Sequence, residues 1–304
     1  MKINEVSREE EGCVDRGLSE IVIDISSYDV VRELGSGGFG KVFLCEKGSS
    51  VVAAKFIDCL DDLCQESFER EIVNLKSLSH PFIVSLVGFS LPCSRTNNKF
   101  VIAMEYVAGG SLSEVLCDRP SWFDNTSRIE IICSIAIGMS FVHSNGIIHR
   151  DLKPANVLLD SNHVARICDF GSSRLMSVDG TLTTRPNVTP VYAAPEVYDG
   201  EYSSKIDVYS FGVIVYEVVT GNRAFRNMTP MQLMKHVGLG KREPIPDSVS
   251  PFAKYLIEVC WSQDPSSRPS FSDICGLLRK NMHLLFSLDT DFERLWEFRS
   301  KYFK

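Results

Sequence analysis

The spacing of apolar residues changes once along this chain, at Gly109 and Gly110. Before these glycines, short segments rich in β-branched and aromatic residues alternate with turn residues, which is typical of strands. After them, apolar residues recur every three or four positions over longer segments, which predicts helices. A chain of 304 residues is long enough for two lobes. The pattern therefore predicts an α+β fold with a β-rich first lobe, a glycine joint and a helical second lobe.

The first lobe is expected to contain one helix among its strands. Strand-like patterns cover residues 28–35, 41–48, 51–58, 83–90 and 99–107. Between the third and fourth patterns, a helix is predicted by four apolar residues at helical spacing, Phe68, Ile72, Leu75 and Leu78. We assign this lobe to residues 28–105 and the joint to residues 105–110, and we expect the polar, acidic residues 1–24 to form a tail.

The second lobe, residues 111–285, is expected to be helical. Helical patterns cover residues 127–146, 203–221, 250–261 and 270–282, and the second of them is apolar nearly all round, as in a buried core helix. Residues 286–304 form a second expected tail, which contains the aromatic segment "FERLWEFRSKYF". We expect this segment to form a helix packed on the second lobe, and a partner-binding site stays open as the alternative.

The overall composition argues against several classes of protein. Charged residues make up 23% of the chain and the formal net charge is −7, so we expect no nucleic-acid partner. We find no apolar run long enough to cross a bilayer and no signal-peptide or lipidation motif, so we expect no membrane anchor. The ten cysteines lack zinc-site spacing and are interpreted as reduced thiols, which predicts a cytoplasmic protein.

A glycine-rich turn, "GSGGFGKVF", runs from Gly35 to Phe43. Glycines lack a Cβ, so the backbone can approach a ligand closely and aim its N–H groups at anionic oxygens. For an isolated motif of this kind, a plain hairpin turn is the alternative. Because a strand pattern rather than a helix follows Gly40, we interpret the segment as a β-hairpin flap and not as a dinucleotide-binding turn.

One lysine, Lys55, interrupts the apolar strand "VVAAKFI". Burying an unpaired charge is costly, so we expect an anion close to it. The anion is either a phosphate held by the glycine turn or a carboxylate of the following helix, where Glu66, Glu69 and Glu71 compete. Glu71 shares the helical face of Leu75, and a lysine that snorkels at a strand edge is the alternative.

Charged residues crowd into the segment 149–159, "HRDLKPANVLL", just before an apolar strand. A second acidic motif, "RICDFGSSR", places Asp169 at a strand end. Carboxylate and amide oxygens are the ligands that Mg²⁺ takes when it is shared with phosphates. Asp169 and Asn156 are therefore candidate metal ligands, and for an isolated Asp-Phe-Gly sequence a simple turn is the alternative.

Taken together, these motifs resemble the eukaryotic protein kinase family. The chain contains, in the family's order, "GSGGFGKV", "VAAK", Glu71, "HRDLKPAN", "DFG", "APE", "DVYSFG" and "RPSF", over roughly residues 28–285. The resemblance implies a bilobal fold and transfer of the γ-phosphoryl group of ATP to a protein substrate. It also implies ATP and Mg²⁺ as cofactors, with Mn²⁺ as an alternative metal.

The resemblance implies roles for four residues of the two acidic motifs. Asp151 accepts or orients the proton of the substrate hydroxyl, and Lys153 stabilises the phosphoryl group during its transfer. Asn156 and Asp169 hold the metal ion.

In the first lobe, the resemblance implies that Lys55 binds the α- and β-phosphates and pairs with Glu71. In the second lobe, it implies a structural ion pair between Glu196 and Arg268. The other residues implied to contact ATP are Leu34, Gly35, Ser36, Gly37, Gly38, Phe39, Gly40, Val42, Ala53, Met104, Glu105, Val107 and Leu158.

Two features favour serine and threonine as the acceptor residues. "HRDLKPAN" carries Lys153 two places after Asp151, and "VTPVYAAPE" places Thr189 where serine/threonine kinases keep a threonine that contacts both. "DVYSFGVIVYEVVTG" and "CWSQDPSSRPSF" are similar to the tyrosine-kinase-like group. We identify a serine/threonine kinase of that group that acts in intracellular signalling. A dual-specificity kinase, a pseudokinase scaffold and a small-molecule kinase are the alternatives.

The resemblance also bears on regulation, because in the family an arginine at the position of Arg150 marks activation by phosphorylation. The segment 172–189 is rich in hydroxyls, and its candidate phosphosites for an upstream kinase are Thr181, Thr183 and Thr184. A loop that is ordered without modification is the alternative.

Overall fold

The computed structural model describes residues 19–37, 40–58, 62–92, 96, 99–118, 124–176, 182, 189–286 and 290–303. The chain divides into two compact units. The first, here the sheet unit, comprises residues 1–72 and 86–106, and the second, the helical unit, comprises residues 73–85 and 107–304. The boundary after residue 106 falls within the expected joint, whereas residues 73–85 group with the helical unit and not with the first lobe.

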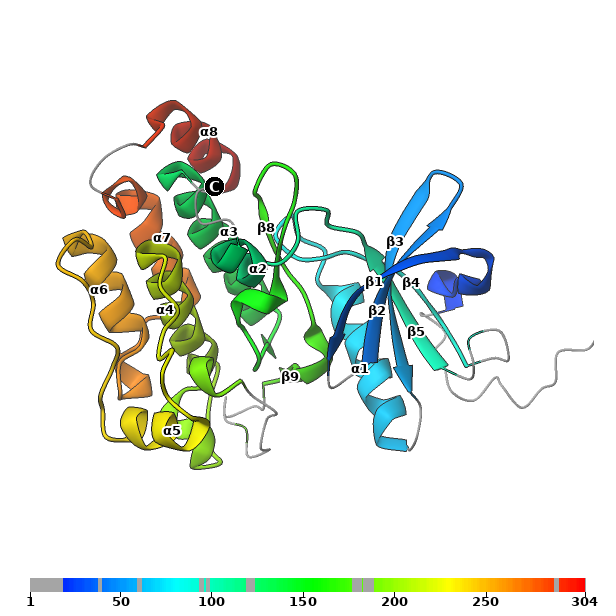
Figure 1. Cartoon of the computed structure of the whole chain (residues 1–304), viewed down its shortest axis with the longest axis horizontal. Coiled ribbons are helices and arrows are strands. Elements are labelled where there is room, and N and C mark those ends of the chain that lie inside the picture. Colours follow the sequence, from blue (N-terminus) through cyan, green and yellow to red (C-terminus); the bar gives the residue numbers. More distant parts are fainter. Residues whose placement is uncertain are drawn as a thin grey trace, which may run out of the picture. The chain divides into compact units, whose positions relative to one another are not determined.

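The sheet unit contains a five-stranded antiparallel sheet with the order β1-β2-β3-β5-β4 (Figure 1). Its strands are β1 (Asp29–Gly37), β2 (Gly40–Lys47), β3 (Ser50–Asp58), β4 (Leu86–Ser90) and β5 (Lys99–Glu105). On one face, Phe68 of α1 (Asp62–Ser77) packs against Phe89 and Phe100, with ring centroids 5.8 and 4.3 Å apart. Side chains alternate between the two faces of a strand, so the opposite face carries a second buried cluster. That cluster consists of Ile25, Cys45, Val52, Ala54, Val101 and Ala103.

Residues 19–24, which the sequence pattern assigns to a tail, pack on the edge strand β4. Val22 forms a bridge with Phe89, and the Ile23 N–H donates to the Phe89 carbonyl at 2.8 Å. Gly88 permits this approach, because a Cβ there would lie 2.5 Å from a backbone oxygen of the segment. The described part of the expected tail therefore covers an otherwise open sheet edge.

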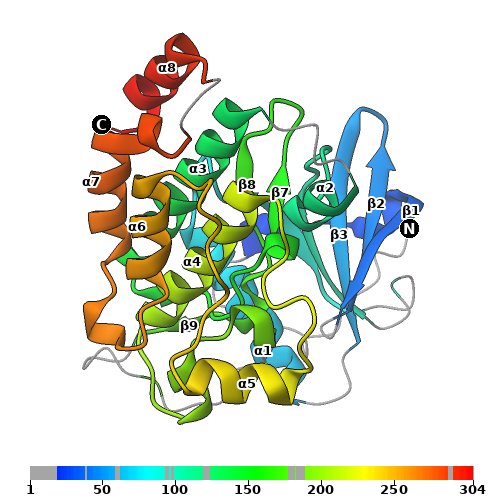
Figure 2. The same ribbon diagram turned by 60° about the vertical axis from the view of Figure 1, so that its left-hand side comes forward.

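The helical unit is built from the remaining helices of the described residues (Figure 2). They are α2 (Leu112–Asp118), α3 (Asn125–Ser144), α4 (Lys205–Thr220), α5 (Pro230–Gly238), α6 (Pro251–Cys260), α7 (Phe271–Asn281) and α8 (Phe292–Tyr302). Two short antiparallel hairpins pair β6 (Ile147–Ile148) with β9 (Arg174–Leu175) and β7 (Val157–Leu159) with β8 (Ala165–Ile167). The prediction of an α+β fold with a sheet followed by a helical region is confirmed.

Short 3-10 helices connect these elements. They are η1 (Ser19–Ile21), η2 (Ile25–Ser27), η5 (Pro154–Asn156), η6 (Phe170–Ser172), η7 (Pro190–Tyr192), η8 (Pro195–Tyr198), η9 (Pro265–Ser267) and η10 (Met282–Leu284).

Helix α4 forms the core of the helical unit, as its apolar sequence predicts. Its residues 206–218 are buried, and α3 and α6 pack against it. Gly212 lets α6 approach closely, because a Cβ there would lie 2.8 Å from the Cβ of Cys260. Gly221 follows the last residue of the helix, Thr220, and its φ of 69° is left-handed and favours glycine.

Helices α2 and α5 are absent from the sequence-based prediction. The start of α5 nevertheless carries a recognisable signal, a capping box in which the Thr229 side chain accepts from the Gln232 N–H and the Gln232 side chain accepts from the Thr229 N–H. The helix is short and partly exposed, so it lacks the long apolar stripe on which the prediction depends.

No helix of the described residues is long and apolar enough to cross a membrane.

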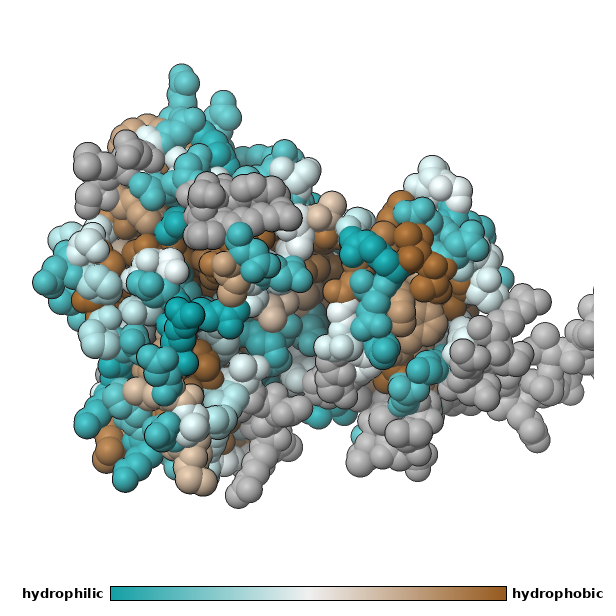
Figure 3. Space-filling view, viewed as in Figure 1, coloured by the Kyte–Doolittle hydropathy of each residue, from teal (hydrophilic) through white to brown (hydrophobic). Residues whose placement is uncertain are grey.

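Apolar side chains reach the surface over the first three strands (Figure 3), where Val30, Val31 and Val51 are 57%, 50% and 40% exposed. Exposed apolar residues of this kind are common in folded proteins, so we assign no function to them.

Candidate active site

The glycine-rich turn joins β1 to β2 in the sheet unit. Gly35 pairs with Val42 and Gly37 pairs with Gly40, which gives the β-hairpin that the strand pattern after Gly40 predicts. Gly40 has a φ of 127°, and a Cβ there would lie 2.1 Å from the carbonyl oxygen of Phe56. Only glycine fits at this position. Two predicted contact residues, Gly38 and Phe39, lie outside the described residues.

A buried ion pair joins β3 to α1. The Lys55 Nζ donates to both carboxylate oxygens of Glu71 at 2.9 Å, and the two residues are 6% and 2% exposed. Of the three glutamates that compete in the sequence, the structure therefore selects Glu71. Glu66 instead lies 4.0 Å from Arg70, and Glu69 accepts from Gln65.

The other predicted nucleotide contacts are divided between the two units. In the sheet unit, Val42 pairs with Lys55 across β2 and β3, and Ala53 pairs with Met104 across β3 and β5. Leu34 falls at an irregularity of β1, Ser36 pairs with Lys41, and Glu105 ends β5. In the helical unit, Val107 is buried and Leu158 forms a bridge with Ser111.

Three functional groups converge after β6 in the helical unit. The Lys153 Nζ lies 2.6 Å from the Asp151 Oδ2 and 2.9 Å from the Thr189 Oγ1. The Thr189 hydroxyl in turn donates to the Asp151 Oδ1 at 3.2 Å. The structure therefore brings together the aspartate, lysine and threonine that the sequence places up to 38 positions apart.

A buried carboxylate holds the backbone of this loop. Asp207 of α4 accepts the N–H groups of His149 and Arg150, both at 2.9 Å, and the Nε2 of His143 lies 2.8 Å from its Oδ2. Arg150 has a φ of 73°, which is strained for a residue with a side chain, so these bonds stabilise an unfavourable backbone.

The charge state of Asp207 follows from the same contacts. Burial alone would raise the pKa of this carboxyl, but the hydrogen bond and charge of His143 and the bond from the Arg150 N–H outweigh burial. The pKa of Asp207 is therefore lowered. His143 is absent from the predicted site, although its place in the last turn of a predicted helix shortly before the charged loop is visible in the sequence.

The candidate metal ligands lie at the ends of the β7–β8 hairpin. The Asn156 Nδ2 donates to the Asp151 carbonyl at 2.9 Å and to its Oδ2 at 3.2 Å, which leaves the Asn156 amide oxygen as the atom that would bind a cation. Asp169 follows β8 with a left-handed φ of 63°. The Cys168 N–H donates to the Asn156 carbonyl at 3.0 Å and so ties the two strand ends together.

These oxygen donors fit a hard cation that takes its remaining ligands from phosphates. Among the described residues, no group of three or more His, Cys, Asp or Glu side chains is arranged to hold a metal ion by itself.

Further from the loop, two pairs support the helical unit. Arg268 donates to both carboxylate oxygens of Glu196, at 2.6 and 2.9 Å, which gives the ion pair implied by the resemblance. The rings of His149 and Phe170 lie 5.0 Å apart and are fully buried.

The regulatory candidates Thr181, Thr183 and Thr184 lie outside the described residues. Between them, Leu182 exchanges backbone hydrogen bonds with Tyr202 at 2.8 and 3.1 Å. The Arg150 guanidinium lies 5.8 Å from the centroid of the Tyr202 ring, in cation–π contact.

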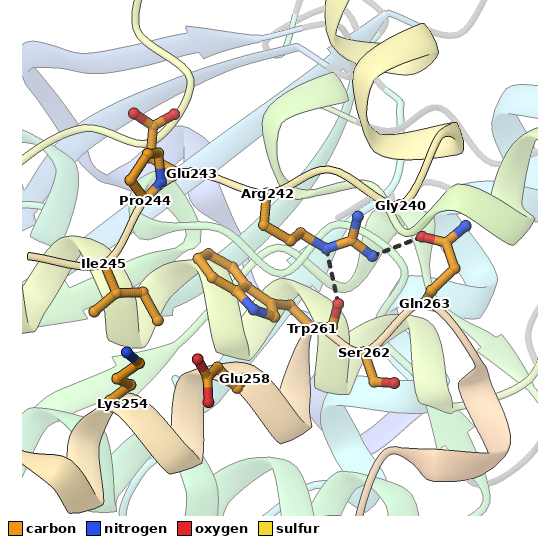
Figure 4. Close-up of a pocket in the computed structure, with 10 residues that line it drawn as sticks. All are labelled: Gly240, Arg242, Glu243, Pro244, Ile245, Lys254, Glu258, Trp261, Ser262 and Gln263. Atoms are coloured by element: carbon orange, nitrogen blue, oxygen red, sulfur yellow. Dashed lines mark hydrogen bonds between the residues drawn. The ribbon is translucent and has the colours of Figure 1, made fainter.

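A separate hollow of about 450 Å³ opens between α6 and the segment after α5 (Figure 4). Trp261 lies at its centre, and the Arg242 guanidinium donates to the Trp261 carbonyl and to Gln263, both at 2.9 Å. None of the residues that line it belongs to the predicted site. Its lining mixes both signs of charge, so it indicates no particular ligand.

Comparison with known proteins agrees with this geometry. The family model described as "Protein kinase domain" matches residues 28–277. A probable serine/threonine-protein kinase of Dictyostelium discoideum is 37% identical over 268 residues, which cover 86% of this chain and 29% of that protein. The serine/threonine-protein kinase CTR1 of Arabidopsis thaliana is 36% identical over 273 residues, which cover 86% of this chain and 33% of that protein.

One relative is named for a different acceptor residue. The seven transmembrane domain-containing tyrosine-protein kinase 1 of Dictyostelium discoideum is 34% identical over 283 residues, which cover 87% of this chain and 40% of that protein. The chain thus spans less than half the length of each of these three relatives.

Proposed function

This chain belongs to the protein kinase family, and we propose that it transfers the γ-phosphoryl group of ATP to serine and threonine hydroxyls of protein substrates. The observation that carries the proposal is the triangle of Asp151, Lys153 and Thr189. A kinase that has lost its activity would not need to keep all three polar groups in mutual contact. The pseudokinase alternative therefore has no support in the geometry of this loop.

The geometry supports a division of labour in the helical unit. Phosphoryl transfer depends on positioning and charge stabilisation, since there is little covalent chemistry for the protein to perform. Asp151 is proposed to orient the acceptor hydroxyl and to take up its proton, while Lys153 stabilises negative charge on the transferring group. The Thr189 hydroxyl is hydrogen-bonded to both Asp151 and Lys153, which supports a role in keeping the two side chains in a fixed relative position.

Asn156 and Asp169 are proposed to hold Mg²⁺, which when bound would offset the negative charge of the phosphates. In the sheet unit, Lys55 is proposed to bind the α- and β-phosphates. Its pairing with Glu71 fixes the ammonium group and offsets the cost of burying it. The Gly35–Gly40 hairpin offers backbone N–H groups for the same phosphates.

The direct test of the proposal uses purified protein, Mg-ATP and a library of serine, threonine and tyrosine peptides. We expect Asp151→Asn to lower the rate by about 10²–10⁴-fold, the usual value of a positioned acid or base. Asp199→Asn is the matched control, because Asp199 is exposed in the same unit. Equal rates for the wild type and Asp151→Asn would refute the assignment of Asp151.

The choice of acceptor residue is tested with Thr189. Thr189→Ser keeps a hydroxyl that can bond to Asp151 and Lys153, whereas Thr189→Val removes it with little change of shape. We expect the serine variant to retain activity and the valine variant to lose most of it. Analysis of the phosphorylated amino acids then decides between serine/threonine and dual specificity, the alternative favoured by the relative named as a tyrosine kinase.

Regulation by an upstream kinase is part of the proposal. Arg150 lies beside Asp151 and in contact with Tyr202, which pairs with Leu182 of the segment that contains the candidate threonines. A phosphate on Thr181, Thr183 or Thr184 would add acceptor oxygens for an arginine. Phosphatase treatment should then lower activity in step with phosphate occupancy, and undiminished activity would refute regulation by phosphorylation.

We also propose a cytoplasmic location, where ATP is available and thiols stay reduced.

A further inference from the structure

Helix α8 lies beyond residues 28–277, the region that the family model matches. Its two faces differ. Leu295 and Phe298 are 4% and 6% exposed, whereas Trp296 on the other face is 64% exposed. The buried face therefore packs on the helical unit, beside α3 (Figures 1 and 2).

An ion pair anchors the start of α8 to α3. The Arg294 side chain donates to both carboxylate oxygens of Glu130, and the distance from its Nε to the Oε1 is 2.9 Å. Glu130 is only 5% exposed, and burial raises the pKa of its carboxyl despite the opposing effect of Arg294. The Asp291 N–H also donates to the Thr126 hydroxyl at 2.8 Å. These contacts fix α8 in one place.

Two rings of α8, those of Phe298 and Tyr302, lie against Phe82 in the segment between α1 and β4. The Phe82 ring lies 6.0 Å from the Phe298 ring and 4.7 Å from the Tyr302 ring, and Phe82 is fully buried. On its other side Phe82 meets α3 at Gly138, where a Cβ would lie 3.1 Å from the Phe82 carbonyl oxygen. Phe82 is thus held between α3 and α8.

The backbone of this segment holds the strand that leads to Asp169. The Ile167 N–H donates to the Phe82 carbonyl, and the Val84 N–H donates to the Ile167 carbonyl, both at 2.9 Å. Ile167 ends β8 and lies two residues before Asp169. A shift of Phe82 would therefore act directly on the backbone that positions this carboxylate.

We propose that Phe298 and Tyr302 of α8 are positioning residues for the metal-binding aspartate, which act through Phe82 and Ile167. The proposal rests on the proposed function insofar as Asp169 is taken to bind Mg²⁺ with ATP. It gives α8 a part in phosphoryl transfer although α8 lies outside the matched domain. Supporting contacts of this kind typically change metal affinity or activity by about 10–100-fold when they are removed.

The test compares Phe298→Ala/Tyr302→Ala with two controls, Trp296→Ala and Tyr302→Phe. Trp296 lies on the exposed face of the same helix, and Tyr302→Phe keeps the ring that meets Phe82. We expect the Mg²⁺ concentration for half-maximal phosphotransfer to rise about 10–100-fold in the double variant alone. Saturating Mg²⁺ should restore most of the maximal rate, and the KM for peptide should stay unchanged.

Two readouts do not depend on activity. Calorimetric titration of ADP should show the same rise in the Mg²⁺ requirement for binding. Hydrogen exchange should become faster at the Ile167 amide, which donates to Phe82, while the amides of α4 exchange at the wild-type rate. A general loss of stability would instead raise exchange in both places.

The outcomes separate the two proposals. If the double variant is folded and matches the wild type in Mg²⁺ requirement and in Ile167 exchange, α8 is only a structural cover and the inference is overturned. If the double variant does not fold, Tyr302→Ala alone, at the end of α8, takes its place with the same criteria. If the wild type shows no phosphotransfer, the proposed function fails, and the exchange and ADP measurements still decide the role of α8.

Discussion

Replacement of Arg268 by methionine provides a quantitative test of the packing of the helical unit. All five N–H bonds of Arg268 are used. Two go to the Glu196 carboxylate, and the others go to the carbonyls of Ser262, Lys205 and Gln263 at 2.8, 3.0 and 3.4 Å. The Arg268 side chain is fully buried and that of Glu196 is 13% exposed. Arg268→Met keeps an apolar chain in place but removes the arginine donors from Glu196 and from the three carbonyls.

The expected loss of stability follows from this count. Hydrogen bonds to charged groups contribute about 1.5–3 kcal/mol each, and breaking one partner of a buried ion pair costs about 3–5 kcal/mol. Glu196 keeps some contact with water, so we expect a value near the lower end, about 3 kcal/mol. Because folded domains are stable by about 5–15 kcal/mol, the variant should remain folded but with a large loss of stability.

Urea unfolding followed by tryptophan fluorescence measures the effect where it should occur. Trp261 and Trp296 lie in the helical unit, and Trp261 is close to Arg268 in sequence, while the third tryptophan, at position 122, lies outside the described residues. The control is Arg279→Met, since Arg279 is exposed on α7 in the same unit. We expect the control to change the free energy of unfolding by no more than about 0.5 kcal/mol.

A double-mutant cycle completes the test. Glu196→Gln removes the charge that Arg268 neutralises, so the double variant should lose clearly less stability than the sum of the two single variants. If Arg268→Met costs no more than Arg279→Met, or if the two single losses simply add, the reasoning about a coupled buried pair is wrong.

Three further predictions use other parts of the molecule. Gly212→Ala should destabilise by about 1–3 kcal/mol because its Cβ would meet Cys260, whereas Gly276→Ala in α7, with no atom within 4 Å of the added Cβ, should stabilise by up to about 1 kcal/mol; urea unfolding compares them. The folded-state pKa of Asp207 is lowered below its ordinary value of 3.8, so its contribution to stability is present above that pH and is lost as the pH falls through the folded-state pKa. The difference in unfolding free energy between the wild type and Asp207→Asn should therefore shrink below pH 3.8, and a difference that stays constant would contradict this. Lys55→Met should abolish measurable phosphotransfer while circular dichroism stays unchanged, and turnover at the wild-type rate would contradict the proposed role of Lys55.

Residues close together in the sequence could be interpreted without the structure. The pattern around the glycine-rich turn predicts a hairpin because strand signals lie on both sides of it, and β1 and β2 form that hairpin. The stripe of Phe68, Ile72, Leu75 and Leu78 predicts a helix. Helix α1 contains the first three, Leu78 follows its last residue, and all four are buried. Local periodicity suffices in these cases because backbone geometry alone decides which side chains share a face.

The sequence also shows that Lys55 needs an anion, but it leaves three glutamates as candidates. Helical spacing puts Glu71 on the face of Leu75, and the structure shows that this face turns toward β3. Packing of Phe68 on β4 and β5 fixes that rotation of the helix about its axis. Such a rotation depends on partners that are distant in the sequence.

Tertiary structure alone decided the remaining contacts. The sequence places Asp207 and Arg150 57 positions apart, and Phe82 and Tyr302 at opposite ends of the helical unit's sequence. No local signal marks Arg294 as the partner of Glu130, or Tyr302 as a cover for Phe82. Pairs of this kind form only when packed helices bring their surfaces together, because buried charges and rings are stabilised by neighbours in space rather than by neighbours in the chain.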